Sequence, residues 1–402
     1  MTAPTPKRDT ADRVSRTHYQ ARRTFGLGLA FFVTTPLMAL LPHDTGAWLP
    51  LHWFLAGGVL TIISGATQML AVTWSTSPAP NDQAAFIQRV MVAGGAVAVA
   101  AGREYQQSWL LVLGALVVAL ALLLLAALLV IIRQNATTPR YRPAIDAYLA
   151  AIAFGVVGIS IGAALGSGTV SSLNLHGAHL SINLFGLVGL VLLGTLPFFT
   201  ATQARMKMAP VATAGKIYAT VIVAGGATVL ISVFTALNRP GVAAVAMVIY
   251  ASAIVANVAL LPRIKQRQLS WAGARLVQYF LGVTWWVVAV LVLAYQSSTE
   301  ADITPALRTL AIGGFAQIAM ASLSYFGPVV RGGGHVALSA GFALARSWLS
   351  VAAANVAALG ALFEVNEAIA AGLSIWAADV VVRLVIFVRQ PTETREAAAK
   401  AA

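Results

Sequence analysis

Twelve apolar runs divide the chain, each long enough to cross a lipid bilayer as a helix, and this pattern restricts the fold more than any other feature. A helix satisfies its own backbone hydrogen bonds, which the hydrocarbon interior of a membrane cannot do. The sequence therefore predicts an all-α polytopic membrane protein with twelve transmembrane helices. The predicted spans are 24–42, 51–74, 86–102, 108–132, 144–166, 177–202, 214–237, 240–262, 272–295, 304–327, 335–363 and 367–388.

The composition agrees with this fold class, because 59% of the 402 residues are hydrophobic and only 10% are charged. Even a large soluble domain could not hide so much apolar surface from water. Three regions follow: a basic cytoplasmic tail at 1–23, a twelve-helix membrane domain at 24–388, and a cytoplasmic C-terminal tail at 389–402.

The lysines and arginines predict the orientation of the bundle. With the N-terminus inside, 21 of the 26 basic residues fall in inner segments, and the outer loops hold only Arg103, Arg239 and Arg308. Loops rich in lysine and arginine stay on the cytoplasmic side of a cell membrane. We therefore expect a multi-pass protein of the plasma (inner) membrane with both termini cytoplasmic. The same distribution explains the net charge of +13 and argues against nucleic acid as a partner.

Three of the predicted helices share a pattern of small residues. The second reads LHWFLAGGVLTIISGATQML from Leu51, the sixth HLSINLFGLVGLVLLGTLPFF from His179, and the tenth LRTLAIGGFAQIAMASLSYF from Leu307. Superimposing Gly57, Gly186 and Gly313 places these helices about 128 residues, or four helices, apart. The pattern predicts three pseudo-repeated four-helix units.

Histidines gather at the outer ends of two of these helices. The chain has no cysteine, so a metal or cofactor would be held by other side chains. His52 begins the second helix, while His176 and His179 begin the sixth, three residues apart and on one helical face. Imidazole is a common ligand of metals and of haem iron. We therefore take these three as candidate haem or metal ligands, with Asn183, one turn after His179, as an orienting group. Interfacial histidines that only contact water or lipid headgroups are the alternative.

A second polar group is predicted inside the membrane. Arg346 and Asp379 fall about midway along the eleventh and twelfth helices, and Arg383 lies one turn beyond Asp379. A charge at this depth is costly unless it is paired, so we expect an intramembrane ion pair in which Arg346 and Arg383 compete for Asp379. The pair is a structural clamp, part of a proton or ion path, or the place where an arginine meets a haem propionate.

The helix layout and the histidines resemble the catalytic subunit of haem–copper oxidases and, more closely, NnrS-like membrane proteins. The second helix, 51–74, is similar to an NnrS-like helix that carries a histidine followed by glycines. The stretch 176–199 is also similar to the membrane region fused to some actinobacterial multicopper oxidases. The sequence departs from the oxidases at Arg308, where a histidine would match His52, and it lacks their paired histidines on the seventh helix. No tyrosine lies near His179 in sequence, and these departures argue against a complete oxygen-reducing centre.

The resemblance implies a membrane protein that binds haem b, copper or both near the outer face and acts in nitric oxide or copper redox handling. It implies His52 as a haem ligand and His179 as a copper or haem ligand; His176 is added on spacing alone. The alternative functions are a membrane transporter or channel, or a membrane partner of a periplasmic copper oxidase without its own cofactor. The expected partners are the lipid bilayer, a periplasmic copper protein and a second copy of the chain in a homo-oligomer.

Overall fold

The computed structural model describes residues 7–40, 43–332 and 334–390, and within these residues all regular structure is helical. Eleven helices there are long and apolar enough to cross a membrane. Each coincides with one of the last eleven predicted spans. The first predicted span, 24–42, falls in α1 (Lys7–Leu40), and residues 41 and 42 lie outside the described residues. The all-α membrane fold is therefore confirmed.

The chain forms two compact units. Unit 1 consists of residues 1–198 and 210–260, and unit 2 of residues 199–209 and 261–402. The elements that begin in unit 1 are α1, α2 (Trp48–His52), η1 (Trp53–Val59), α3 (Leu60–Ser75), α4 (Asp82–Glu104), α5 (Ser108–Gln134), η2 (Pro139–Tyr141), α6 (Arg142–Gly166), α7 (Leu173–Ser181), η3 (Ile182–Val188), α8 (Gly189–Gln203), α9 (Ala214–Ala236) and α10 (Pro240–Val258). Those of unit 2 are α11 (Gln266–Ala272), α12 (Ala274–Ser298), α13 (Thr304–Thr309), η4 (Leu310–Ala316), α14 (Gln317–Arg331), α15 (Gly334–Leu344), α16 (Trp348–Leu362) and α17 (Asn366–Arg389).

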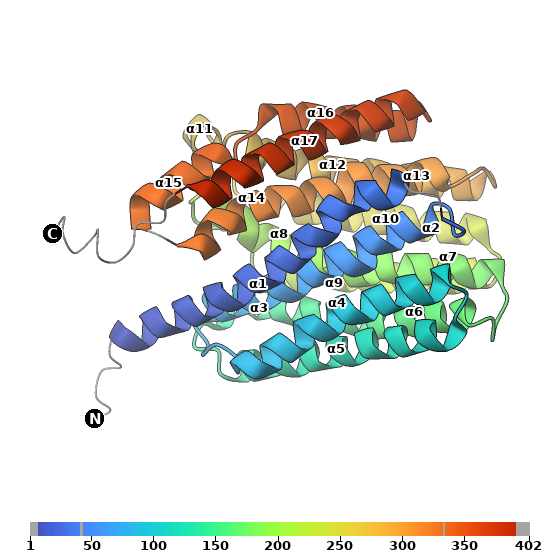
Figure 1. Cartoon of the computed structure of the whole chain (residues 1–402), viewed down its shortest axis with the longest axis horizontal. Helices are drawn as coiled ribbons and strands as arrows, with labels where there is room; N and C mark the ends of the chain where they lie inside the picture. The colour runs from blue at the N-terminus through green and yellow to red at the C-terminus, as the bar shows by residue number, and fades with distance from the viewer. Residues whose placement is uncertain (1–6, 41–42, 333, 391–402) are drawn as a thin grey trace. The chain divides into compact units, whose positions relative to one another are not determined.

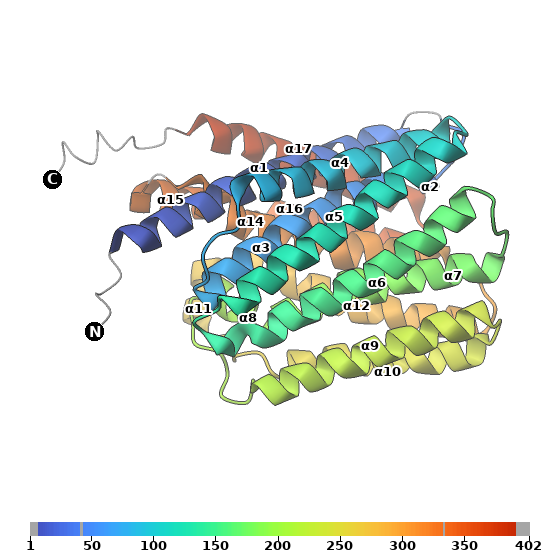
Figure 2. The same ribbon diagram turned by 90° about the horizontal axis from the view of Figure 1, so that it is seen from below.

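Neighbouring helices in unit 1 run antiparallel and are joined by short connections, as the α4–α5 and α9–α10 pairs show (Figures 1 and 2). The spans differ sharply in burial. The most apolar window of the span 173–203 is 94% buried and that of 48–75 is 83% buried, whereas that of 139–166 is only 22% buried. The second and sixth spans are thus the interior helices of this unit. The outer helices expose rows of apolar side chains, as expected of surfaces that face lipid; examples are Leu116, Leu123, Ile222 and Val245.

Three spans, the second, sixth and tenth, each contain a seven-residue π-helical segment at a similar point. The segments η1, η3 and η4 begin at residues 53, 182 and 310, that is, 129 and 128 residues apart. A π-helical turn is rare and is frequently found at functional sites. It also sets the register between the helices, since Gly57 and Gly186 are both fifth in their segments and Gly314 is fifth in η4.

The π-helical register corrects the alignment made from glycines. Gly313 and Gly314 are adjacent, so the sequence alone left the tenth helix ambiguous by one residue. The residue just before each π-helical segment is His52, Ser181 or Thr309. Thr309, not Arg308, therefore corresponds to His52 on the tenth helix.

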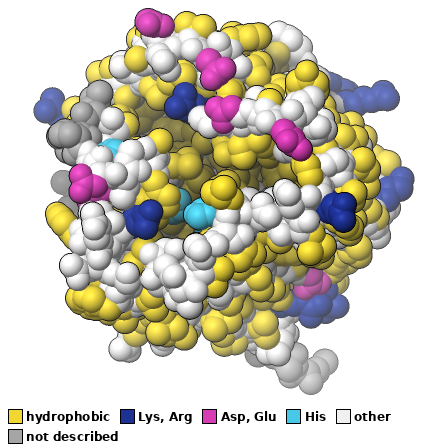
Figure 3. Space-filling view, turned by 90° about the vertical axis from the view of Figure 1, so that its right-hand side faces the viewer, with side chains coloured by type: hydrophobic (Ala, Val, Ile, Leu, Met, Phe, Trp, Pro, Cys, Tyr) yellow, Lys and Arg dark blue, Asp and Glu magenta, His cyan; other side chains and the backbone are white. Residues whose placement is uncertain are grey.

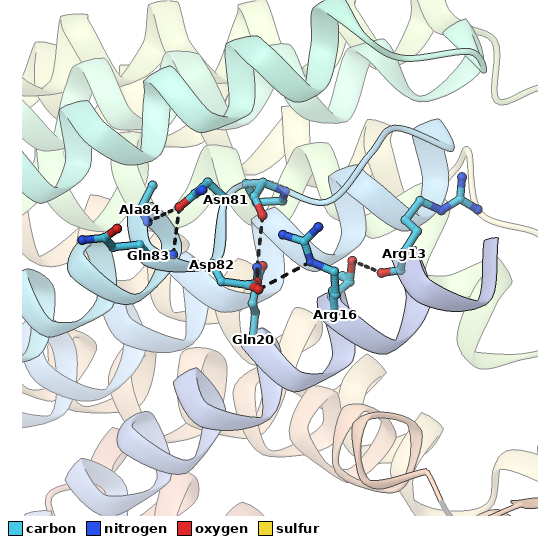
Figure 4. Close-up of polar contacts among 9 residues, drawn as sticks. Arg13, Arg16, Gln20, Asn81, Asp82, Gln83 and Ala84 are labelled. Atoms are coloured by element: carbon cyan, nitrogen blue, oxygen red, sulfur yellow. Dashed lines mark hydrogen bonds and ion pairs between the residues drawn. The ribbon is translucent and has the colours of Figure 1, made fainter. Parts of the chain in front are cut away.

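The helix α1 begins well before its apolar part. Residues 7–23, predicted as a polar tail, belong to the same helix as the apolar residues that follow. Polar contacts fix this extension to the start of α4, where the amide of Gln20 donates to the carbonyl of Pro80 at 3.2 Å and to the carboxylate of Asp82 (Figure 4). Arg16 lies 3.5 Å from the other oxygen of Asp82. The rest of the predicted tails, 1–6 and 391–402, lies outside the described residues.

In unit 2 the eleventh apolar run, predicted as one helix at 335–363, is interrupted. α15 ends at Leu344 and α16 begins at Trp348. Ser347 takes extended backbone angles, and its hydroxyl accepts a hydrogen bond from the amide of Ser350 at 3.0 Å. Serine at an N-cap starts a new helix because its oxygen satisfies one of the free amides of the first turn. Arg346 thus lies in a turn between two helices.

Candidate functional site

His52 is held at the end of α2, directly before the π-helical segment η1. Its Nδ1 lies 3.0 Å from the carbonyl oxygen of Trp48, one turn earlier, and the Trp48 ring stacks on the imidazole with 3.9 Å between ring centres. Because a carbonyl can only accept a hydrogen bond, Nδ1 carries the proton. Nε2 of His52 therefore presents a lone pair.

His179 is held in the same tautomer by a different helix. Its Nδ1 donates to the carbonyl of Gly158 on α6 at 2.8 Å. A cradle of glycines gives it room: a Cβ on Gly162 would lie 2.5 Å from Cε1 of His179, and one on Gly158 would lie 2.5 Å from the amide nitrogen of Asn183. The glycine series on α6 thus lets a histidine and an asparagine of the next span lie against the α6 backbone. The space is fitted to these two side chains.

The two imidazoles lie close together in unit 1, with nearly parallel rings. Their ring centres are 6.3 Å apart and their planes differ by 9°. Neither Nε2 has a hydrogen-bond partner among the described residues. Two nitrogen–metal bonds of about 2.0–2.1 Å, plus about 1 Å from each nitrogen to its ring centre, span about 6 Å. The separation therefore fits one metal ion between the rings.

Asn183 acts on His179 through the backbone. Its amide nitrogen donates to the carbonyl oxygen of His179 at 2.8 Å and lies 3.3 Å from Nδ1 of the same residue. Nδ1 of His179 already donates its proton to the carbonyl of Gly158. The stabilising contact of Asn183 is therefore its hydrogen bond to the carbonyl oxygen of His179. Asn183 thus helps to fix the turn that carries His179.

The other histidines lie apart from this pair. His176 is exposed at the start of α7, and its Nδ1 bonds to the carbonyl of Ser172 at 3.2 Å. His43 is half-buried and bonds to the carbonyl of Met38 at 2.9 Å. His335 is exposed on α15. Figure 3 views the end of the molecule that carries α2 and α7, where histidine side chains are visible among uncharged, basic and acidic side chains.

His52 and His179 have few neighbouring side chains that could add further bonds to a metal. Within 7–40, 43–332 and 334–390, no group of three or more histidine, cysteine, aspartate and glutamate side chains is placed to hold a metal. A metal bound by His52 and His179 would keep other coordination positions, and these suit the four nitrogens of a porphyrin or an exchangeable small ligand.

The predicted intramembrane charges form a pair in unit 2 that leaves Arg346 out. Arg383 lies 2.8 Å from one oxygen of Asp379. The other oxygen accepts from the hydroxyls of Ser347 and Ser350, the latter at 2.6 Å. Arg346 instead donates to the carbonyls of Ser270 and Trp271 at 3.3 and 3.1 Å. It therefore lies level with the turn that precedes α12, near one end of a span rather than halfway along it.

Two parts of the site could not be recognised from the histidine spacing. One is the pair of α6 glycines, Gly158 and Gly162, whose four-residue spacing matches that of Asn183 and His179, the side chains they accommodate. Tyr250, which is fully buried on α10, donates to the carbonyl of Phe185 in η3 at 3.0 Å. A π-helical turn leaves a carbonyl without its usual partner, and no sequence signal marks that need.

The sequence matches no protein-family model and no curated protein.

Proposed function

We propose that the protein is a plasma-membrane protein that binds haem b, with copper as the alternative ligand, between His52 and His179. The observation that carries the proposal is the geometry of the two imidazoles. Both rings use Nδ1 for a backbone carbonyl, both leave Nε2 free, and they lie parallel to within 9° with centres 6.3 Å apart. Metal-ligating histidines commonly donate their second nitrogen to a carbonyl in this way.

The surroundings of both histidines support this role. The carbonyl bonds fix the tautomer and make Nε2 more basic. The glycine cradle on α6 holds His179 in one orientation, and the Trp48 ring does the same for His52. Bound haem or copper would supply one-electron chemistry. With both histidines as ligands, copper would keep a coordination position for a small molecule such as nitric oxide, whereas a haem iron would have all six positions filled. The protein's own contribution is to hold the two nitrogens in place through the Trp48 and Gly158 carbonyls.

We also propose the finer architecture expected from the sequence. Twelve spans with both termini cytoplasmic would place His52 and His179 at the outer end of the bundle. The three π-helical segments, 129 and 128 residues apart, support three four-helix units. When the three π-helical segments are aligned, His52 falls at the same position as Ser181 and Thr309. His179 comes two residues before Ser181, so the two histidines do not occupy equivalent positions in the repeat. A two-histidine centre formed in this way has no counterpart on the tenth helix.

The proposal is tested on protein purified from cells supplied with haem precursor and copper. A pyridine haemochrome spectrum and metal analysis should find about one haem or one copper per chain. His52→Ala and His179→Ala should each lose it, whereas His43→Ala, a matched outer histidine, should retain it. Wild-type protein with neither haem nor copper would refute the proposal.

Membrane transport through the charged group of unit 2 has weaker support. Both oxygens of Asp379 are already hydrogen-bonded, and its side chain is only 8% exposed. A carboxylate with all its bonds made inside the protein fits a clamp that closes the break between α15 and α16 better than a step in an ion path.

A further inference from the structure

An open pocket of about 450 Å³ lies in unit 2 where α11 turns into α12. Residues of this turn form one side of the pocket, and Arg346 and Trp348, from the break before α16, form the other. Its volume lies in the usual range of small-molecule sites, which is about 300–1,000 Å³. None of the groups proposed above for haem or copper contributes to it.

The first turn of α12 directs positive charge into this pocket. Gly273 precedes the helix with φ +60°, and no side chain caps the free amides that follow. The start of a helix carries a partial positive charge and favours anions. A Cβ on Gly273 would lie 2.7 Å from Cδ of Arg346, so the glycine allows the arginine to lie directly against the turn.

Arg346 uses only some of its hydrogen-bond donors within the protein. Nε donates to the carbonyl of Phe342 at 3.3 Å, and Nη1 donates to the carbonyls of Ser270 and Trp271. Nη2 has no partner among the described residues. The guanidinium is therefore oriented by backbone carbonyls and keeps donors free for a ligand in the pocket.

A second, independent observation is a buried positive charge behind the pocket, close enough to Arg346 to interact with it electrostatically. Arg275, in the first turn of α12, is 1% exposed, and its Nε and Nη1 have no hydrogen-bond partner in the described part of the chain. Its only bond there is from Nη2 to the carbonyl of Gln203, at 3.4 Å. Arg205 lies on the Trp271 ring at 4.0 Å, and Arg275 lies 5.0 Å from the same ring. Arg275 also lies 5.3 Å from the Tyr325 ring and 4.8 Å from the Phe342 ring, and these contacts offset part of the cost of burying it. Rings carry no net charge, so its positive charge at the start of the helix is not neutralised.

No carboxylate balances these charges. None of the ion pairs among the described residues includes Arg205, Arg275 or Arg346. The connection before α11 adds two exposed basic residues, Arg263 and Lys265, and the first turn of α11 adds a third, Arg267. Beside the pocket, Trp348 and Leu349 are 61% and 53% exposed, an apolar surface of the kind that lies at the membrane interface.

We propose that this pocket binds the phosphate of an anionic phospholipid headgroup, with Arg346 and the start of α12 contacting the phosphate. Arg275 and Arg205 supply positive potential from behind. Basic pockets between helices on the cytoplasmic side are characteristic sites for anionic lipids. The exposed Trp348 and Leu349 would lie along the glycerol and upper acyl chains.

The test uses the full-length protein in detergent, with bound lipid counted by native mass spectrometry during titration with phosphatidylglycerol or phosphatidylcholine. Phosphatidylglycerol should bind preferentially, and Arg346→Gln should weaken its binding about fivefold. Arg346→Lys keeps the charge and should lose less. Arg267→Gln, which removes an equal charge outside the pocket, should bind as wild type does.

Three results would overturn the proposal. They are equal binding of the two lipids, unchanged binding by Arg346→Gln, and an equal loss in Arg267→Gln. Inorganic phosphate is titrated in parallel; if it displaces phosphatidylglycerol at low millimolar concentration, the site recognises free phosphate and the lipid assignment is wrong. An unchanged Tm serves as the folding control for all three variants, Arg346→Gln, Arg346→Lys and Arg267→Gln.

Discussion

Replacing Gly162 by alanine tests whether the α6 cradle holds His179 in its ligating position. The added Cβ would lie 2.5 Å from Cε1 and 2.8 Å from Nδ1 of His179. Restoring ordinary contact requires the ring to move by about 1 Å, which stretches the 2.8 Å bond to Gly158 beyond hydrogen-bonding range. The loss of that bond is worth about 1 kcal/mol. Loss of such an orienting bond weakens metal binding about 10- to 100-fold, or about 1.4–2.7 kcal/mol.

The assay is a titration of haem or copper into metal-free protein, followed by absorption and by metal analysis. Gly226→Ala is the matched control, because it lies in a neighbouring spanning helix and its Cβ would meet nothing within 4 Å. Alanine raises helix propensity at both positions by up to about 1 kcal/mol, so both proteins should fold. Undiminished affinity in Gly162→Ala would show that the cradle does not position His179.

Three further outcomes are expected. Tyr250→Phe removes the donor to the η3 carbonyl and should lower the free energy of unfolding by about 1–2 kcal/mol, measured as a fall in Tm; an unchanged Tm would contradict the role given to this hydroxyl. Asp379→Asn should lower the free energy of unfolding by about 2 kcal/mol, a moderate loss because Arg383 is one-third exposed and partly hydrated. The double variant Asp379→Asn with Arg383→Gln should lower it by less than the sum of the two single changes. Burial lowers the pKa of His18, in the part of α1 that precedes the apolar residues, because the folded state favours the neutral imidazole. His18 therefore stabilises the fold relative to its charged form above about pH 6.5, and this contribution to the free energy of unfolding is lost as the pH falls below that value. His18→Gln should remove that part of the decline in Tm between about pH 7 and 5; an identical decline in the variant would contradict it.

The helices were predictable because the thickness of the hydrocarbon core sets a minimum length for every apolar helix that crosses it. Their ends agree with the predicted spans within a few residues, for example 214–237 against α9 at Ala214–Ala236. The break at Arg346 was not predictable from hydropathy, because the apolar run continues across it. The serine spacing at 347 and 350 was the one signal of a new helix start, since serine caps helices.

Placing His52 and His179 at one end of the bundle followed from charge and topology, but their mutual geometry did not. That geometry depends on the π-helical segments, on the Trp48 carbonyl and on a glycine series in another helix. Small residues in membrane helices usually indicate close packing, so nothing in the spacing of Gly158 and Gly162 distinguished a histidine cradle from an ordinary helix contact. The choice between Arg346 and Arg383 as the partner of Asp379 also required the structure, because the helix break moves Arg346 away.

The central claim is that His52 and His179 bind the same metal through Nε2. It is tested most directly by locating the metal in an experimental structure of haem- or copper-loaded protein from anomalous scattering at the iron or copper edge. We predict one peak between the two imidazoles, about 2 Å from each Nε2. A peak bound by only one of these histidines, or at another place in the chain, would contradict the account.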